Sequence, residues 1–337
     1  MRPVSALERL LDLTVAGSYG RPGFEAAARR FDPADDLARC EGRVLAVTGA
    51  TAGIGLAAAR MLAQRGAVLV VLGRPSGHSG AALAAIAEAA GGRAPGWVPV
   101  DMSEPASVRA AAQSVLGDHG RLDGLLLNAG VLLDRHELAS TGIERSLSTN
   151  LVGPELLRRL LDPALQASGD GRVVHVSSGG MYSQRLELEK LQSLRGRFDG
   201  VVAYAQAKRA QLVLLERWAQ REAGSTVRSN AMHPGWADTP GVLRSLPRFY
   251  AVMRNLLRTP EQGADSAVWL LSAPRARGLH GAFVLDRRPR ATHLLPWTRE
   301  PEATRQELYG WIDRVCAPFE APLRGSAGEA AGSGQRG

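Results

Sequence analysis

A short strand that runs straight into a glycine-rich turn constrains the fold of this chain more than any other feature. Residues 43–48 have the β-branched, apolar composition of a buried strand, and three glycines follow before an alanine- and leucine-rich helix begins. Small residues let the backbone turn tightly and approach a pyrophosphate, which then lies at the helix N-terminus, where free N–H groups favour negative charge. The plainer alternative is a glycine-rich turn without a ligand. We expect a dinucleotide-binding turn formed by Thr48, Gly49, Gly53, Ile54 and Gly55.

The rest of the chain alternates β-branched runs with helical stretches, a pattern typical of a parallel sheet with crossover helices. It predicts an α/β fold, a Rossmann-type doubly wound parallel sheet of about seven strands with helices on both faces. The expected strands are Arg43–Thr48, Ala67–Leu72, Trp97–Val100, Leu122–Leu127, Arg172–Val176, Thr226–Ala231 and Ala282–Leu285. The expected helices are Gly53–Gln64, Ala81–Ala89, Pro105–Leu116, Gly142–Gln166 and Tyr204–Glu222.

Four regions are expected along the chain. They are an N-terminal extension (1–41), a dinucleotide-binding catalytic domain (42–298), a C-terminal helical extension (299–324) and a disordered tail (325–337), which is built of Gly, Ser and Ala with little to bury. Segments 179–202 and 236–260 interrupt the alternation of strands and helices. Because long insertions after strand ends line the ligand crevice of such sheets, we expect these two segments to form the walls of a substrate site.

The composition argues against several classes of function. The net charge is +8, yet the arginines are spread along the chain and no basic run is interleaved with aromatics, so we expect no nucleic-acid partner. The two cysteines, Cys40 and Cys316, support neither a disulfide framework nor a metal site. No stretch approaches the roughly 20 apolar residues of a membrane span, and we expect a cytoplasmic protein. Residues 4–15 could form a short amphipathic helix, which leaves peripheral membrane contact through the N-terminal extension open.

The choice of cofactor is made at the end of the second strand, where an acid would bind the ribose hydroxyls of NAD and an arginine would accept the 2′-phosphate of NADP. Arg74 stands at this point and no acid does, so NADP(H) is preferred over NAD(H). The objection is that Arg74 is one surface arginine among many. Further cofactor contacts are expected where the third and fourth strands end, at Asp101, Met102, Asn128, Ala129 and Gly130.

Tyr204 and Lys208 form an i, i+4 pair on an expected helix, where both side chains share a face. The chain contains 39 arginines and only two lysines, so a retained lysine indicates a task that guanidinium cannot perform. A compact ammonium can approach a phenol and a ribose hydroxyl at once, whereas guanidinium is a wide planar fork. The pair therefore has the character of a tuned proton donor. The alternative is an ordinary surface tyrosine beside a solvated lysine.

In combination, six motifs of this chain resemble those of the short-chain dehydrogenase/reductase family. They span about residues 42–286 and occur in that family's order: Thr48-Gly49-x-x-x-Gly53-Ile54-Gly55, Asn128-Ala129-Gly130, Asn150, Val176-Ser177-Ser178, Tyr204-x-x-x-Lys208 and Pro234-Gly235-x-x-x-Thr239. Longer stretches, among them 176–181 and 232–242, are similar to the subgroup called dehydrogenase/reductase family member 12, which is itself similar to retinol dehydrogenases. One departure is Leu127, where many relatives have a second Asn, and slightly altered packing near the adenosine is expected there.

The resemblance implies a catalytic tetrad of Asn150, Ser178, Tyr204 and Lys208. Tyr204 would exchange a proton with the substrate oxygen, and Lys208 would help to bring the phenol pKa from about 10 to about 7. Ser178, preferred over Ser177 at the end of the strand, would hydrogen-bond the substrate oxygen. Asn150, in the middle of a long helix, would hold a water that relays protons to Lys208. The same resemblance adds cofactor contacts at Tyr204, Lys208, Pro234, Gly235 and Thr239.

We therefore expect an NADP(H)-dependent oxidoreductase of the carbonyl reductase type, which transfers a hydride between nicotinamide and a small lipophilic carbonyl or alcohol substrate. Its apolar pocket would be lined by Met181, Tyr182, Trp236, Phe249 and Tyr250, although each is equally suited to the domain core. The alternative is a non-catalytic dinucleotide-binding sensor or scaffold on the same fold. The oligomeric state stays open, and a homodimer is one arrangement that the sequence allows.

Overall fold

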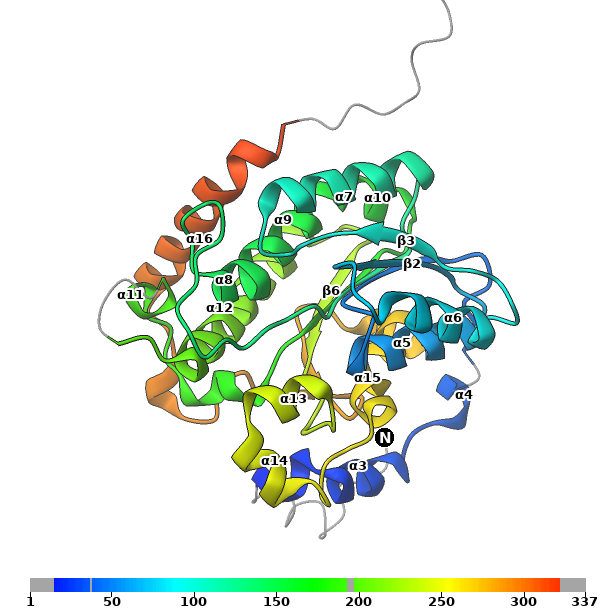
Figure 1. Ribbon diagram of the computed structural model, residues 1–337, viewed down its shortest axis with the longest axis horizontal. Helices are drawn as coiled ribbons and strands as arrows, with labels where there is room; N and C mark the ends of the chain where they lie inside the picture. The colour runs from blue at the N-terminus through cyan, green and yellow to red at the C-terminus, as the bar shows by residue number, and fades with distance from the viewer. Residues whose placement is uncertain (1–14, 37, 193–196, 322–337) are drawn as a thin grey trace, which may run out of the picture.

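A central sheet with helices on both faces organises the protein (Figure 1), and the computed structural model describes residues 15–36, 38–192 and 197–321. Within these residues the sheet has eight strands in the order β3-β2-β1-β4-β5-β6-β7-β8. Neighbouring strands are parallel except β7 and β8, which are antiparallel. The strands are β1 (Val44–Thr48), β2 (Val68–Gly73), β3 (Gly96–Pro99), β4 (Gly124–Leu127), β5 (Arg172–Val176), β6 (Arg228–Met232), β7 (Phe283–Leu285) and β8 (Arg288–Arg290).

The expected Rossmann-type doubly wound sheet is confirmed, and its seven expected strands differ from β1–β7 by no more than two residues at either end. The sequence did not indicate β8, which is only three residues long and contains Pro289. Asp286 and Arg287 connect β7 to β8, and their φ angles of 53° and 58° suit a two-residue hairpin turn. This short antiparallel strand covers the edge of β7.

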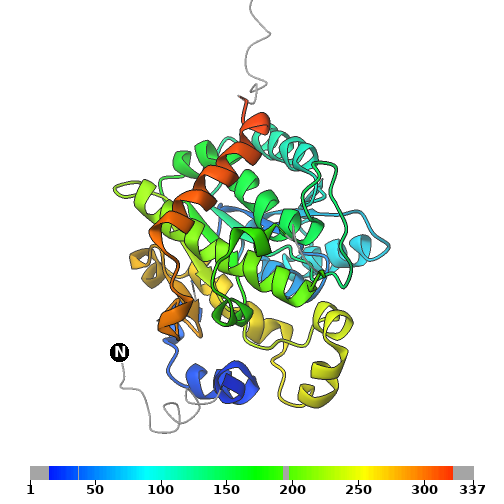
Figure 2. The same cartoon turned by 90° about the vertical axis from the view of Figure 1, so that its left-hand side faces the viewer.

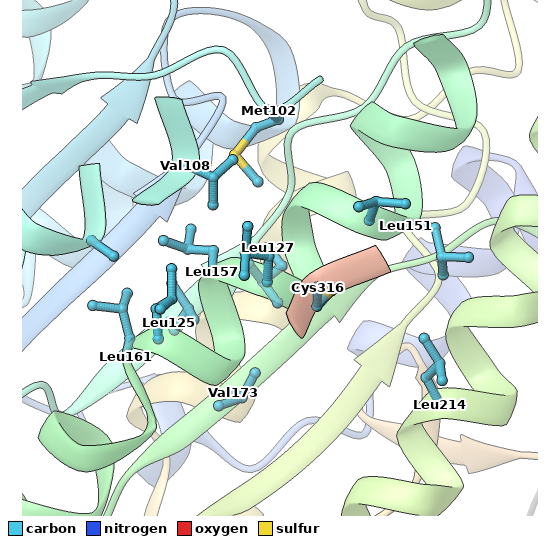
Figure 3. Packing of buried hydrophobic residues seen from close by; sticks show 14 of the residues in the cluster. Met102, Val108, Leu125, Leu127, Leu151, Leu157, Leu161, Val173, Leu214 and Cys316 are labelled. Carbon is cyan, nitrogen blue, oxygen red and sulfur yellow. The ribbon is translucent and has the colours of Figure 1, made fainter. Parts of the chain in front are cut away.

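Two layers of apolar side chains sit on opposite faces of the sheet because successive residues of a strand point to opposite sides. Leu45 and Val47 of β1 face a cluster shared with α5 and α15, whereas Ala46 faces a cluster shared with α7, α9, α12 and α16. Figure 3 shows the second cluster, in which Leu125, Leu157 and Cys316 lie together. The main helices are α5 (Gly53–Gln64), α6 (Ser79–Ala89), α7 (Pro105–Asp118), α9 (Gly153–Leu160), α10 (Asp162–Ala167), α12 (Gly200–Arg221), α15 (Pro260–Ser272) and α16 (Glu302–Cys316).

The single helix expected over residues 142–166 is wrong. The segment forms a short helix, α8 (Arg145–Leu147), then a π-helical turn (Ser148–Val152), and then α9 and α10. Pro154 explains the interruption, since it has no N–H to donate to the carbonyl four residues earlier, which is that of Asn150. A π-helical turn inside a helix is frequent at functional sites. Asn150 therefore lies in a turn and not in the middle of a regular helix.

The N-terminal segment packs against the end of the sheet at which β6 and β7 finish. It contains α2 (Val15–Tyr19), α3 (Arg21–Ala28) and α4 (Pro33–Asp36), and in Figure 2 these blue helices lie beside the yellow helices α13 (Pro240–Ser245) and α14 (Pro247–Met253). The indole Nε1 of Trp269 donates to Asp35 Oδ2 over 3.0 Å, and Arg287 pairs with Asp36 at 2.6 Å. These long-range contacts hold the segment against the main body of the protein.

The two ends of the printed sequence lie mostly outside the described residues. Of the amphipathic helix expected over residues 4–15, only Val15 is described, and the tail at 325–337 lies outside the described residues. In the ranges that the structure covers, every helix is too short or too polar to cross a membrane. A short helix, α11 (Leu188–Leu191), lies within the segment 179–202.

Candidate active site

The glycine turn after β1 has the geometry that a pyrophosphate requires. Gly49 and Gly53 have φ angles of 69° and 53°, which favour glycine, and a side chain on Gly55 would collide with the carbonyl of Gly49. Ala52 precedes α5, and its side chain cannot cap the helix. The first N–H groups of α5 are therefore available to donate to a ligand. The turn and the helix start thus fit an anionic phosphate group, which would accept from these backbone donors.

Thr48 and Asn128 brace this turn from inside the protein. The Thr48 hydroxyl accepts from the backbone N–H groups of Asn128 at 2.9 Å and Ala129 at 3.0 Å, and it donates to the Leu126 carbonyl. The amide of Asn128 donates to the carbonyls of Thr48 and Gly49. The two side chains therefore tie the end of β1 to the end of β4, a brace that the sequence motifs did not suggest.

Arg74 and Asp101 lie just beyond the carboxyl ends of β2 and β3, the two strands on one side of β1. Arg74 is exposed directly after β2. Partial burial acts to raise the pKa of Asp101, but hydrogen bonds from Ser103 and the nearby charges of Arg74 and Arg145 outweigh it and lower that pKa. Met102, in contrast, turns its side chain into the hydrophobic core (Figure 3), so only its backbone is left for a cofactor contact.

Tyr204, Ser178 and Lys208 meet where β5 ends and α12 begins its second turn. The phenol of Tyr204 is hydrogen-bonded to Ser178. Lys208 is buried, its Nζ lies 5.4 Å from the centre of the Tyr204 ring, and it donates to the Val176 carbonyl over 2.8 Å. Ser177 instead donates to the backbone carbonyl of Lys208 at 3.3 Å. The second serine faces the phenol and the first is bound to the helix backbone.

The pKa values of this pair differ from the simple expectation that Lys208 makes the phenol acidic. Burial raises the pKa of Tyr204, and the hydrogen bond with Ser178 opposes this only in part. Burial also lowers the pKa of Lys208 to about 7, because the charged ammonium loses its hydration. In this structure Tyr204 is therefore a protonated phenol at neutral pH, and Lys208 is the group that titrates there.

Asn150 is fixed by hydrogen bonds on both sides of its amide. Its Nδ2 donates to the carbonyls of Val131 and Ser146, and its Oδ1 accepts from the Val131 N–H at 3.1 Å. The carbonyl of Asn150, which Pro154 leaves without a helical partner, accepts from Gln211 Nε2 at 2.7 Å. Sequence reasoning missed Gln211, although it lies three residues after Lys208 and seven after Tyr204 on the same helical face.

Gly130 leaves a space between Asn150 and Lys208. A Cβ atom added to this glycine would lie 2.8 Å from Asn150 Oδ1 and 3.8 Å from Lys208 Nζ. The oxygen already accepts one hydrogen bond and has a second lone pair. The structure thus brings Asn150 and Lys208 to one place, with a glycine where any side chain would intrude.

The loop after β6 holds the remaining expected cofactor residues. Gly235 has a φ of 71° and Pro234 precedes it. Thr239 accepts a hydrogen bond from the Val242 N–H as the cap of α13, and its methyl group lies against Gly53 of the glycine turn. The loop therefore reaches back from β6 to the start of α5. Ile54 packs on Gly263 of α15 and helps to set the position of that helix.

Residues of the two segments expected as substrate walls lie partly in the core and partly beside a surface pocket. Met181 is fully buried in a cluster with Leu212 and Phe283, so it belongs to the core. Trp236 and Phe249 stack edge to face with ring centres 5.1 Å apart. A surface pocket of about 550 Å³ opens beside the start of α12, a few residues before Tyr204. It is lined by Leu132, Leu133, Asp134, Arg197, Phe198, Asp199, Gly200, Val201 and Ser245.

Two residues outside the expected set reach the same region. His233 is buried at the end of β6, and its Nδ1 accepts from the Gly235 N–H at 3.0 Å. Tyr19, from the N-terminal segment, packs its ring on His233 with the centres 4.5 Å apart. His233 stands directly before the Pro234-Gly235 motif and could have been singled out on that ground. No local signal in the sequence indicates Tyr19, because its ring contacts residues that are far from it in the sequence, such as Gly179 and His233.

The chain is similar to known short-chain dehydrogenases over most of its length. A family model described as short chain dehydrogenase matches residues 43–246. Dehydrogenase/reductase SDR family member 12 from Bos taurus is 38% identical over 304 residues, 90% of this chain and 95% of that protein. Polyprenol dehydrogenase from Mus musculus is 36% identical over 258 residues, 73% of this chain and 76% of that protein. A solved short chain dehydrogenase from Escherichia coli CFT073, complexed with NADPH, is 27% identical with a TM-score of 0.62, covering 75% of this chain and 99% of that one.

Proposed function

The chain belongs to the short-chain dehydrogenase family, and we propose that it is an NADP(H)-dependent reductase of a lipophilic carbonyl compound with Tyr204 as the proton donor. The observation that carries the proposal is the meeting of Tyr204, Ser178 and Lys208 beside Gly130, at the carboxyl edge of the sheet. The neighbouring glycine turn fits the phosphates of a dinucleotide. Ligands of doubly wound sheets bind at this edge, where the strand order reverses between β1 and β4.

Tyr204 is suited to donate a proton to a carbonyl oxygen. Burial keeps its pKa above the ordinary value, so the phenol is protonated at neutral pH, as a general acid must be. Ser178, which is hydrogen-bonded to the phenol, would donate to the same oxygen as negative charge develops on it. Bound NADPH would supply the hydride to the carbonyl carbon. The protonation state of Tyr204 favours reduction over alcohol oxidation near pH 7.

Lys208 would return a proton to Tyr204 after each turnover. With a pKa of about 7, it exists in both protonation states near neutrality, which suits a group that passes protons on. The space at Gly130 between Lys208 Nζ and Asn150 Oδ1 could admit a water to resupply it. Asn150 would orient that water through its free lone pair. The relay that the resemblance implies is thus compatible with the arrangement of these residues.

A preference for NADP(H) over NAD(H) is part of the proposal. Arg74 is the first residue after β2, it is exposed, and no acid stands beside it to bind ribose hydroxyls. Guanidinium can bind a phosphate through two parallel hydrogen bonds. The E. coli relative complexed with NADPH supports this choice.

A lipophilic substrate is supported by the pocket at the start of α12, where Leu133, Phe198 and Val201 provide apolar surface. The name of the mouse relative, polyprenol dehydrogenase, refers to a long apolar alcohol, in line with this class. We further propose a cytoplasmic protein that touches membranes at most peripherally through residues 4–15. Since residues 15–36 are packed on the main body, liposome sedimentation with a variant lacking only residues 1–14 tests this contact; equal partitioning with and without the segment would refute it.

The proposed chemistry is tested by Tyr204→Phe with NADPH and a panel of retinoid, steroid and medium-chain aldehyde substrates. Removing a general acid typically lowers turnover by a factor of about 100 or more, while NADPH binding should stay within about twofold. Tyr309→Phe is the control, because its phenol binds the Val213 carbonyl on α12 away from Ser178. If Tyr204→Phe reduces the aldehydes as well as the wild type, the donor is another group. If the wild type binds NADPH and reduces none of the panel, the sensor or scaffold alternative gains support.

A further inference from the structure

We propose that Tyr19 is a positioning residue of the candidate active site, which holds the loop carrying Ser178 against the loop carrying Gly235. The expected effect of Tyr19 on turnover rests on the proposed function. Its expected effect on the two loops rests on geometry alone. It gives the N-terminal segment a task inside the site, although this segment lies before the sheet in the sequence and outside the region that the family model matches.

The backbone of Tyr19 is joined directly to the loop after β6. Its carbonyl accepts from the Trp236 N–H at 2.8 Å and from Arg258 Nε at 2.9 Å. Arg258 is fully buried, donates to the Ser18 carbonyl at 2.7 Å, and makes a two-pronged ion pair with Asp286. A planar guanidinium with five donors can satisfy all of these acceptors at once. Tyr19 is therefore held by a rigid, charge-assisted anchor.

The same arginine controls the shape of the loop that it anchors. Gly235 has a positive φ, and a side chain on it would collide with the Arg258 guanidinium. The Arg258 backbone also accepts from the Asp238 N–H and donates to the Trp236 carbonyl. The loop from Trp236 to Asp238 is thus enclosed between Arg258 on one side and Tyr19 on the other.

The side chain of Tyr19 faces the other loop, which begins with Ser178. A Cβ atom added to Gly179 would lie 2.6 Å from His233 Nε2 and 3.3 Å from Tyr19 Cε2, so the Gly179 backbone is in contact with both rings. The Tyr19 ring lies 4.5 Å from His233 and 6.0 Å from Trp236, centre to centre. Ser178 is bonded to Gly179, and any movement of this backbone moves the hydroxyl that binds Tyr204.

The phenol group of Tyr19 completes the link at the far end of that loop. It is hydrogen-bonded to Tyr182, whose own hydroxyl donates to the Ala291 carbonyl at 2.6 Å. Burial, the neighbouring Tyr19 phenol and this hydrogen bond raise the pKa of Tyr182. Tyr19 therefore touches the Ser178 loop at two points, with its ring at Gly179 and with its hydroxyl at Tyr182.

A purely structural role would only attach the N-terminal segment to the protein. Phe31 provides the matched control for this role, because it belongs to the same segment and packs on Arg287 at 4.0 Å and on Phe24. Removing Phe31 loosens the segment away from the Ser178 loop. Removing Tyr19 takes away the ring and hydroxyl that touch this loop.

The test compares Tyr19→Ala, Tyr19→Phe and Phe31→Ala in the full chain by hydrogen–deuterium exchange, NADPH fluorescence titration and reduction of decanal. Tyr19→Ala should speed exchange in peptides covering 177–183 and 233–237 and should lower kcat by about 10- to 100-fold, the cost of a small misplacement of reacting groups. NADPH affinity should change by less than about threefold. The substitution should therefore lower kcat and leave the KM for NADPH nearly unchanged. Tyr19→Phe should speed exchange only at 180–183, and Phe31→Ala should leave both peptides as in the wild type.

Unchanged exchange in both peptides of a folded Tyr19→Ala variant would overturn the proposal, and so would equal effects of Tyr19→Ala and Phe31→Ala. If Tyr19→Ala does not fold, Tyr19→Phe decides through the 180–183 peptide. A wild type that reduces no aldehyde counts against the proposed function and leaves the exchange comparison to decide the role of Tyr19.

Discussion

The two sides of the candidate site are built in different ways. On the cofactor side, Thr48 and Asn128 join strands β1 and β4 through hydrogen bonds between residues 80 positions apart, inside one run of alternating strands and helices. On the opposite side, Arg258 binds the Ser18 carbonyl across 240 positions, and Tyr19 packs on His233. The cofactor side thus needs small residues at fixed spacing, whereas the other side needs the N-terminal segment to meet loops that lie far from it in the sequence.

Buried arginines and the buried lysine of this protein have different partners. Arg158, Arg209 and Arg258 are buried and bind carboxylates or backbone carbonyls, as a rigid fork of donors does well. Lys208 is buried, and within the described parts of the chain its ammonium has no carboxylate partner and donates to the Val176 carbonyl. In this arginine-rich chain the arginines fasten segments together, and the buried lysine is reserved for a position where a proton can be lost.

The sharpest way to break the cofactor side is to fill the space at Gly130. Gly130→Ala should lower kcat by at least about 100-fold, because the new Cβ would lie 2.8 Å from Asn150 Oδ1 and force the Asn150 amide to move. NADPH affinity, measured by fluorescence titration, should fall less than kcat. Gly117→Ala on α7 is the control, since a methyl group there meets open space. Full activity in Gly130→Ala would show that the space between Asn150 and Lys208 has no role in proton transfer.

A smaller effect on the same side is expected for Arg74→Ala. Losing charge-assisted hydrogen bonds to a phosphate costs about 1.5–3 kcal/mol, which weakens NADPH binding by roughly 10- to 100-fold. NADH has no 2′-phosphate, so its dissociation constant should change by less than about threefold. Arg60→Ala, an exposed arginine of α5, controls for the general loss of positive charge. Equal losses for NADPH and NADH would remove the case for phosphate recognition at Arg74.

The sequence predicted the cofactor side well because its determinants are local. Glycines at 49, 53 and 55 are required by backbone angles and close approaches, which composition and spacing reveal directly. The same holds for seven of the eight strands. The prediction of one continuous helix around Asn150 was wrong. It followed the apolar pattern, which continues through Pro154, and overlooked that Pro154 has no N–H to donate to the carbonyl of residue 150.

The opposite side could not be predicted, because burial and long-range contacts decide it. The sequence left Met181 equally suited to the pocket and the core, and it lies in the core with Leu212 of α12 and Phe283 of β7. The surroundings of Tyr204 could not be predicted for a similar reason: an i, i+4 spacing cannot tell that Lys208 turns its ammonium to the Val176 carbonyl, or that burial raises the pKa of the phenol. Spacing places two side chains on one face, but their environment sets their pKa values.

The smallest expected effect is a pH dependence of the unfolding free energy. It tests whether burial lowers the pKa of Lys208 in the folded protein. Its pKa is about 7 in the folded protein against an ordinary value of 10.5, so between these values the unfolded chain binds more protons than the folded one. Stability must therefore rise with pH from about 7 to 10.5, by at most about 1.4 kcal/mol per pH unit from this group. Lys208→Met should lose this rise, and urea denaturation at pH 7, 8 and 9 measures it.

Lys190→Met is the matched control for this comparison, because Lys190 is the other lysine, is exposed, and pairs with Glu187 at 2.8 Å. It should keep the wild-type dependence of unfolding free energy on pH. Parallel curves for Lys208→Met and the wild type would mean that the ammonium is stabilised in the folded state, by charges or water that its contact with Val176 does not supply. Lys208 would then stay charged at neutral pH and could act on Tyr204 only through its field, and a proton relay through Asn150 would lose its donor.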